Sequence, residues 1–192
     1  MILDNFQTKK PHYFMYNDVF SDDDCDGILE LQSNQLITLT NQNNPVLDNY
    51  QNKNNLFIYE SCILQGSEIY EKILMDYVLD ANARIFGFNI WGIEKDLELL
   101  NFKDGYYYDW HEDILKYSTE PNDRKLVVYA FINGDDVNGK VADIHFKIEN
   151  EVVSGKKGSV LIFPSFLTYS IKASSASIRQ VLQCHIIGPK FK

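Results

Sequence analysis

A short aromatic segment, YYYDWHED at residues 106–113, carries side chains that can bind a metal ion. If it forms the end of a β-strand, alternate residues share a face, so His111 and Asp113 point the same way. An imidazole and a carboxylate projected together suit a divalent transition metal such as Fe(II). The alternative is a solvated strand end whose His111 and Asp113 only hydrogen-bond each other, so the elements around the segment must decide between the two interpretations.

The composition predicts one globular domain spanning residues 1–192. A chain of 192 residues is long enough to bury most of its apolar surface in one core, and 45% hydrophobic against 23% charged residues argues against disorder. The formal net charge of −9 repels phosphate backbones, so nucleic acid is disfavoured as a partner. The sequence does not indicate an oligomeric state.

Cysteine spacing and hydropathy bear on the compartment. Cys25, Cys62 and Cys184 are scattered, without the spacing of a zinc site or a disulfide framework, which favours a reducing compartment. The N-terminal residues lack a basic region followed by a long apolar run, and no window approaches 18 uninterrupted apolar residues. We expect a cytoplasmic protein without a membrane partner.

The first half of the chain predicts helices, and the second half predicts strands. Apolar spacing and capping signals, Ser21 with Asp24 in the first case and Ser67 in the second, predict helices over 21–33 and 67–85. Strands are expected at 13–20 and 55–64, with an Asn-rich loop at 41–55. After Gly87 the segments FNIWGI, DLELLNFK, YYYDWHED, KLVVYAFIN, VADIHFKI, SVLIFPS, LTYSIKA and IRQVLQCHIIG read as strands. This order predicts an α+β fold whose body is an antiparallel sandwich or barrel.

The ordered set of segments over residues 13–190 resembles the Fe(II)/2-oxoglutarate-dependent dioxygenases, most closely their prolyl 4-hydroxylase-like branch. The resemblance rests on the helix ending before FGFNI, the Gly before the H-x-D strand, the FPS segment and a late arginine. It implies a double-stranded β-helix, or jelly roll, with flanking N-terminal helices. It also implies Fe(II) as the metal and 2-oxoglutarate as the co-substrate.

The resemblance assigns roles to particular residues. His111 and Asp113 match the first two iron ligands, and Arg179 matches the residue that pairs with the far carboxylate of 2-oxoglutarate. An arginine suits that task because its planar fork donates two parallel hydrogen bonds to a carboxylate. Taken alone, Arg179 is equally well read as a surface cation on an edge strand.

The chain also departs from the family pattern. Tyr169 occupies the position of the family's distal histidine, so it is the candidate third metal ligand, although a phenol binds Fe(II) less well than imidazole at pH 7. Phe131 and Val181 stand where relatives offer hydroxyls to the co-substrate. For His145 and His185 we expect structural roles, because histidines among apolar strand residues are usually hydrogen-bonded core residues.

Three functions are consistent with these residues. The first is an oxidoreductase that uses Fe(II) and 2-oxoglutarate to hydroxylate a peptidyl or small-molecule C–H bond, as the prolyl hydroxylase resemblance implies. The second is a dioxygenase-fold binding module that has lost full metal or co-substrate binding, which the substitutions at Tyr169, Phe131 and Val181 favour. The third is an ordinary jelly-roll binding protein with an accidental H-x-D.

Overall fold

The computed structural model describes residues 12–33, 35–41, 57–114, 119–134, 140–172 and 178–191. These residues contain two α-helices, α1 (Asp22–Ser33) and α2 (Glu68–Ala81), and a π-helical turn over Asn82–Phe86 that prolongs α2. Apart from a short 3-10 helix over Ile148–Asn150, the rest of the described regular structure is antiparallel sheet, so the predicted α+β class is confirmed. None of the described helices is long and apolar enough to cross a membrane.

The described strands pair into one sheet. Their bounds are β1 (Phe14–Tyr16), β2 (Thr38–Asn41), β3 (Phe57–Ile63), β4 (Gly92–Ile93), β5 (Glu98–Lys103), β6 (Tyr107–His111), β7 (Asn122–Gly134), β8 (Lys140–Phe146), β9 (Val152–Lys156), β10 (Val160–Pro164), β11 (Tyr169–Ile171) and β12 (Ile178–Pro189). The main order is β1-β10-β7-β12-β5-β3-β6-β11-β8-β9, with β2 beside β3 and β4 beside β12.

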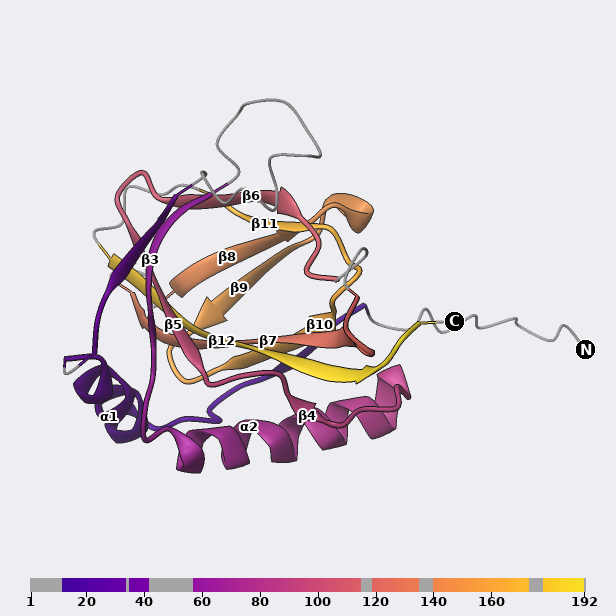
Figure 1. The fold of residues 1–192 in the computed structure, drawn as a ribbon. Coiled ribbons are helices and arrows are strands. Elements are labelled where there is room, and N and C mark those ends of the chain that lie inside the picture. The colour runs from indigo at the N-terminus through magenta and orange to yellow at the C-terminus, as the bar shows by residue number, and fades with distance from the viewer. Residues whose placement is uncertain are drawn as a thin grey trace, which may run out of the picture.

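This sheet folds back on itself, so that two layers face each other. In Figure 1, β5, β12, β7 and β10 lie next to the helices, and β6, β11, β8 and β9 lie on the opposite side. One apolar cluster fills the space between the helices and the first layer, and it includes Ile28 and Val78. A second cluster, rich in aromatic rings, fills the space between the layers and includes Phe146 and Tyr169. The candidate site lies in this inner cluster.

Strand β7 explains how one apolar run serves both clusters. Leu126, Val128, Ala130 and Ile132 belong to the helix-side cluster, whereas Val127, Tyr129 and Phe131 belong to the inner one. All seven side chains are fully buried, as expected for a strand covered on both faces. The alternation along β7 therefore directs Tyr129 toward the inner cluster between the layers.

Most predicted elements are present, with shorter bounds. The capping box is formed, because the Ser21 amide donates to Asp24 Oδ2 and the Asp24 amide donates to Ser21 Oγ. Ser67 precedes α2 as predicted, but its hydroxyl donates to the Leu64 carbonyl and contacts Glu71 rather than accepting a cap N–H. Of FNIWGI only Gly92–Ile93 is a strand, and most of the predicted loop over 41–55 lies outside the described residues.

Gly158 is the tightest point between the N-terminal segment and the sheet. Its φ of +79° is left-handed, and a Cβ there would lie 2.2 Å from the Phe20 carbonyl oxygen. That close approach exists because the Gly158 carbonyl accepts the amides of Val19 and Phe20.

Gly158→Ala should therefore destabilise the protein more than Gly105→Ala does. Gly105 has a similar φ of +76° but open space around its Cβ position. We expect about 1 kcal/mol for the left-handed conformation in both variants, and roughly 1–3 kcal/mol more for Gly158→Ala from the clash. Urea unfolding of the two variants measures the difference, and equal losses would contradict this account of the turn.

Candidate metal and co-substrate site

His111 and Asp113 meet as predicted. His111 is the last residue of β6, and Asp113 follows just beyond the strand, where its amide donates to the Ser165 carbonyl at 2.9 Å. The His111 Nε2 atom lies 3.5 Å from Asp113 Oδ1. The backbone bond to Ser165 thus keeps the strand direction after β6 has ended, so the two side chains still share a face.

The hydrogen bonding of His111 leaves one ring nitrogen free. Its Nδ1 lies 2.6 Å from the Asp109 carbonyl oxygen. Because a carbonyl only accepts, Nδ1 carries the proton and Nε2 carries a lone pair. Burial lowers the pKa of His111, which favours this neutral form. The Nε2 atom is itself buried without a hydrogen-bond partner, and the Tyr108 ring stacks on the imidazole at 3.5 Å between centroids.

Asp113 is a buried carboxylate held mainly through one oxygen. Its Oδ2 atom accepts a hydrogen bond from the Tyr169 hydroxyl at 2.8 Å, and lies 3.1 Å from His185 Nε2 and 3.5 Å from Gln183 Nε2. Burial alone raises the pKa of Asp113, but the hydrogen bond and electrostatic attraction of His185, the electrostatic attraction of His111 and the hydrogen bond from the Tyr169 hydroxyl outweigh it. The pKa of Asp113 is therefore well below its usual range, and the group is ionised at neutral pH.

Tyr169 lies inside this cluster, paired across strands with His111. It is fully buried, and burial together with the nearby Asp113 charge raises its pKa well above that of an ordinary phenol. The group is thus a neutral donor. Because its proton goes to Asp113, the Tyr129 hydroxyl must donate in the 2.8 Å contact between the two phenols. Gln183 in turn donates to Tyr129 at 3.1 Å, which completes a chain of donors ending at Asp113. Metal ligation by Tyr169 stays a prediction.

We expected a structural role for His185, and the structure places it beside Asp113. His185 shares the inward face of β12 with Arg179, Val181 and Gln183, and the far end of this row of side chains reaches Asp113. Alternation from Arg179 was the available signal, but it does not say which end of the row meets β6. His145 lies between Ile144 and Phe146, which both face the inner cluster, so its own side chain is on the other face of β8.

Arg179 lies at the other end of the same row. It is only 4% exposed, its two terminal nitrogens donate to the carbonyls of Lys172 and Tyr106 at 2.9 and 3.0 Å, and it lies over the Phe102 ring. Its Nε atom is buried without a partner, and burial lowers the pKa of the guanidinium. Four residues of strand separate Arg179 from Gln183 by about 13 Å, so the guanidinium shares the interior with Asp113 without touching it.

Phe131 and Val181 pair across β7 and β12 and are fully buried. They line the inner cluster without hydroxyls. Tyr129, two residues before Phe131, supplies a hydroxyl to the Asp113 end instead.

Two donor groups in the site fit a cation. His111 Nε2 and Asp113 Oδ1 both present electron pairs and lie 3.5 Å apart. Adjacent ligands of an ion with bonds of about 2.1 Å lie about 3 Å apart, so a small shift accommodates one ion between them. Among the residues that the structure describes, no group of three His, Cys, Asp or Glu side chains is arranged to hold a metal. The unpartnered Nε–H of Arg179 can donate a hydrogen bond to an anion.

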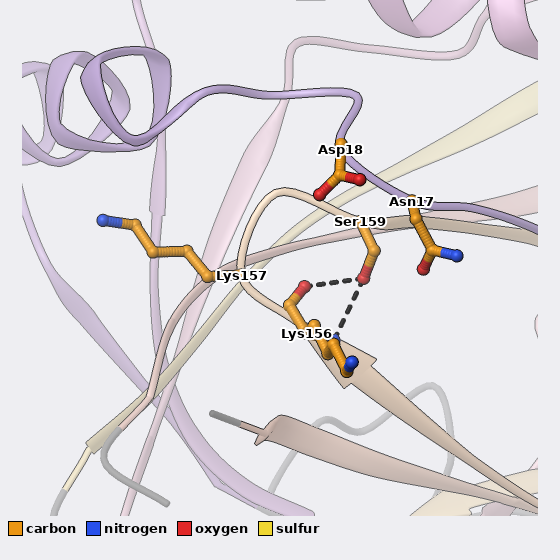
Figure 2. A pocket seen from close by; sticks show the side chains of 5 residues that line it. All are labelled: Asn17, Asp18, Lys156, Lys157 and Ser159. Atoms are coloured by element: carbon orange, nitrogen blue, oxygen red, sulfur yellow. Dashed lines mark hydrogen bonds between the residues drawn. The ribbon is translucent and has the colours of Figure 1, made fainter. Parts of the chain in front are cut away.

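A separate polar hollow lies between the β1–α1 connection and the β9–β10 turn. Figure 2 shows its lining by Asn17, Asp18, Lys156, Lys157 and Ser159. The Ser159 hydroxyl is already bonded to the Lys156 backbone, and Lys157 pairs with Asp22 and Asp26 on α1. These contacts hold the turn against the helix, so this hollow is structural.

The Tyr169 bond to Asp113 has a measurable effect on stability and on its pH dependence. In metal-free protein, Tyr169→Phe should lower the free energy of unfolding by roughly 1–3 kcal/mol at neutral pH, because it leaves Tyr129 and Asp113 each short of one buried partner. Since the native pKa of Asp113 is depressed, its bonds stabilise the protein fully above the unfolded pKa of about 3.9, and this is lost as pH falls through the native pKa. The difference in the free energy of unfolding between Tyr169→Phe and the wild type should therefore become smaller below about pH 4.

The matched control is Tyr13→Phe. The Tyr13 hydroxyl also donates to a carboxylate, Glu151, at 2.8 Å, but from a less buried position. Urea unfolding at several pH values measures both variants. A Tyr169→Phe loss no larger than the Tyr13→Phe loss would contradict the central role of this bond.

No family model and no curated protein sequence matches the chain. Solved structures do match. A viral collagen prolyl hydroxylase from Paramecium bursaria Chlorella virus-1, in complex with 2-oxoglutarate, superposes with a TM-score of 0.64 at 13% identity, covering 93% of this chain and 97% of its own.

Two further prolyl hydroxylases are similar to the same extent. A prolyl-4-hydroxylase from Pseudomonas putida gives a TM-score of 0.66 at 9% identity, covering 94% of each chain. A prolyl hydroxylase from Trichoplax adhaerens, in complex with a hypoxia-inducible factor peptide, gives 0.66 at 15% identity over 91% of this chain and 83% of that one. The jelly-roll prediction is thus confirmed: the chain has the fold of the prolyl hydroxylase-like 2-oxoglutarate and Fe(II) oxygenases.

Proposed function

We propose that this protein is an Fe(II)- and 2-oxoglutarate-dependent oxygenase, an oxidoreductase that hydroxylates a C–H bond of a peptide or small molecule. One observation carries the proposal. Two of the residues predicted to bind these groups, His111 and Arg179, each keep one buried polar atom without a partner. The first atom is a lone pair that suits a cation, and the second is a donor that suits an anion. Buried unsatisfied atoms are rare in native proteins, and a position for an ion is one explanation for them.

Metal and co-substrate would bind to residues at two ends of the inner cluster. His111 and Asp113 would hold the metal, and Arg179 would take the far carboxylate of 2-oxoglutarate. The bound iron and co-substrate would supply the oxidising chemistry. The protein's own part is positioning and exclusion of water: Phe146, Phe163 and Tyr169 are fully buried around the metal end. The charges also balance, because the dianionic co-substrate and ionised Asp113 face a divalent cation and one guanidinium.

The proposal includes the organisation of the whole chain. We assign residues 1–192 to one oxygenase domain, since both clusters draw on elements from the beginning and the end of the described chain. All three cysteines are buried and unpaired, which fits a reducing, cytoplasmic setting. The resolved prolyl hydroxylase with a bound peptide supports a peptide or small molecule as the substrate class.

A second candidate function, a binding module that has lost full metal or co-substrate binding, is favoured by a different observation. The protein itself supplies partners for Asp113 Oδ2 and for both terminal nitrogens of Arg179. Two hydroxyls that would contact the co-substrate are missing at Phe131 and Val181, and each lost partner of a buried carboxylate costs about 1–3 kcal/mol. The two candidates differ in whether metal and 2-oxoglutarate bind.

Anaerobic titration separates these candidates. With Fe(II) and 2-oxoglutarate added to the purified protein, we expect a weak visible charge-transfer band, because the co-substrate chelates the metal. Admission of O₂ should then yield succinate. A chelator-treated sample without added iron serves as the control. Absence of metal uptake would rule out the oxygenase and leave the binding module.

Arg179→Met should abolish 2-oxoglutarate binding and leave metal binding nearly intact, because the guanidinium lies at the far end of the β12 row from Asp113. Arg124→Met is the control, since Arg124 pairs with Glu94 at 2.7 Å and has no assigned part in co-substrate binding. Isothermal titration with 2-oxoglutarate and an uncoupled succinate assay measure the effect. Succinate production that survives Arg179→Met undiminished would refute the arginine assignment.

A further inference from the structure

The two oxygens of Asp113 have different surroundings. Oδ2 lies within hydrogen-bonding range of Tyr169, His185 and Gln183, which reach it from β11 and β12. Oδ1 faces only the His111 Nε2 atom among the contacts of this cluster, at 3.5 Å. A carboxylate oxygen accepts about two hydrogen bonds, so Oδ2 is saturated by the protein and Oδ1 is not.

We propose that, among the residues that the structure describes, two bind the metal, through His111 Nε2 and Asp113 Oδ1, and that Tyr169 and His185 are positioning residues that hold Asp113 Oδ2. This rests on the metal-binding part of the proposed function. It differs from a third ligand at Tyr169, and it agrees with the absence of a three-residue His, Cys, Asp or Glu group among the described residues. Mixed nitrogen and oxygen donors suit a divalent transition metal.

The contacts of Tyr169 support a positioning role. A phenol binds a metal through its deprotonated oxygen. The Tyr169 hydroxyl instead donates a hydrogen bond to Asp113 and accepts one from the Tyr129 hydroxyl. Its oxygen is thus occupied on both sides. The chain from Gln183 through Tyr129 and Tyr169 orients the carboxylate from β7, β11 and β12 at once.

The contact of His185 leads to the same conclusion. Asp113 is a pure acceptor when ionised, so we assign the proton of His185 to Nε2, which then donates across the 3.1 Å contact. That nitrogen then has no lone pair for an ion. His185 and His111 also approach different oxygens of the carboxylate, Oδ2 and Oδ1 respectively.

This arrangement has a chemical consequence. Two protein ligands would leave more of a bound metal's coordination to groups from outside the protein, and would hold the metal more weakly than three. Its affinity then depends strongly on how well Asp113 is oriented, because hydrogen-bonding partners of a ligating carboxylate typically change metal affinity by about 10–100-fold.

Co(II) titration of the full chain, without 2-oxoglutarate or O₂, tests the proposal by isothermal calorimetry. His185→Leu should weaken binding by about tenfold or more, and His185→Gln should restore it to within about threefold of wild type, because the amide still donates to Oδ2. A direct ligand role would leave His185→Gln as impaired as His185→Leu and would overturn the proposal. His145→Leu, on the outer face of β8, is the control and should bind Co(II) as wild type does.

Tyr169 needs a spectroscopic readout. Fe(III)-loaded wild type should lack an intense phenolate-to-iron charge-transfer band, and Tyr169→Phe should weaken Co(II) binding by about tenfold while leaving the Fe(III) spectrum unchanged. An intense band that disappears in Tyr169→Phe would make Tyr169 a ligand and refute the two-ligand site. These measurements do not depend on turnover. Loss of succinate production with intact, His185-sensitive metal binding would refute the oxygenase alone.

Discussion

The candidate site depends on one buried carboxylate. Asp113 is 7% exposed, and burying an ionised carboxylate is costly unless hydrogen bonds and opposite charges compensate. Here the compensation comes from three strands, because Tyr169 lies on β11 and Tyr129, which supports it, on β7, while His185 and Gln183 lie on β12. The sheet must therefore close into two layers before the charge is satisfied, so closure of the fold and assembly of the site are one event.

The aromatic lining follows from the same requirement. Tyr108, Phe146, Phe163 and Tyr169 lie near His111 and Asp113, and the ring centroid of Tyr169 lies 4.9 to 6.4 Å from those of the other three. Large flat rings fill the space between the layers and exclude water. Exclusion of water strengthens the electrostatic interactions inside the site. It also raises the free-energy cost of each buried polar atom that has no hydrogen-bond partner. The unpartnered atoms of His111 and Arg179 stand out against this background.

The inward-facing side chains of β12 run from one end of the inner cluster to the other. Arg179 begins the row among main-chain carbonyls, Val181 continues it beside Phe131, and Gln183 and His185 end it at Asp113. That His111, Asp113 and Arg179 share one interior was predictable from the order of motifs. Their separation along the strand was not, because residue spacing gives distance along one strand and not its position relative to β6.

The sequence by itself determined the local features. Alternation made His111 and Asp113 share a face, the capping residues placed α1, and the doubly apolar run of β7 required cover on both sides. Strands β2 and β9 were missed, since TLTN and VVSGK carry too little apolar alternation for a local signal. Only the tertiary structure decided which partners Asp113 and Arg179 have. His185 and the Tyr169 hydroxyl contact the Asp113 carboxylate, and Arg179 donates hydrogen bonds to main-chain carbonyls. These contacts join residues 7 to 73 positions apart, and such long-range pairing depends on how the layers pack and not on any local preference of the chain.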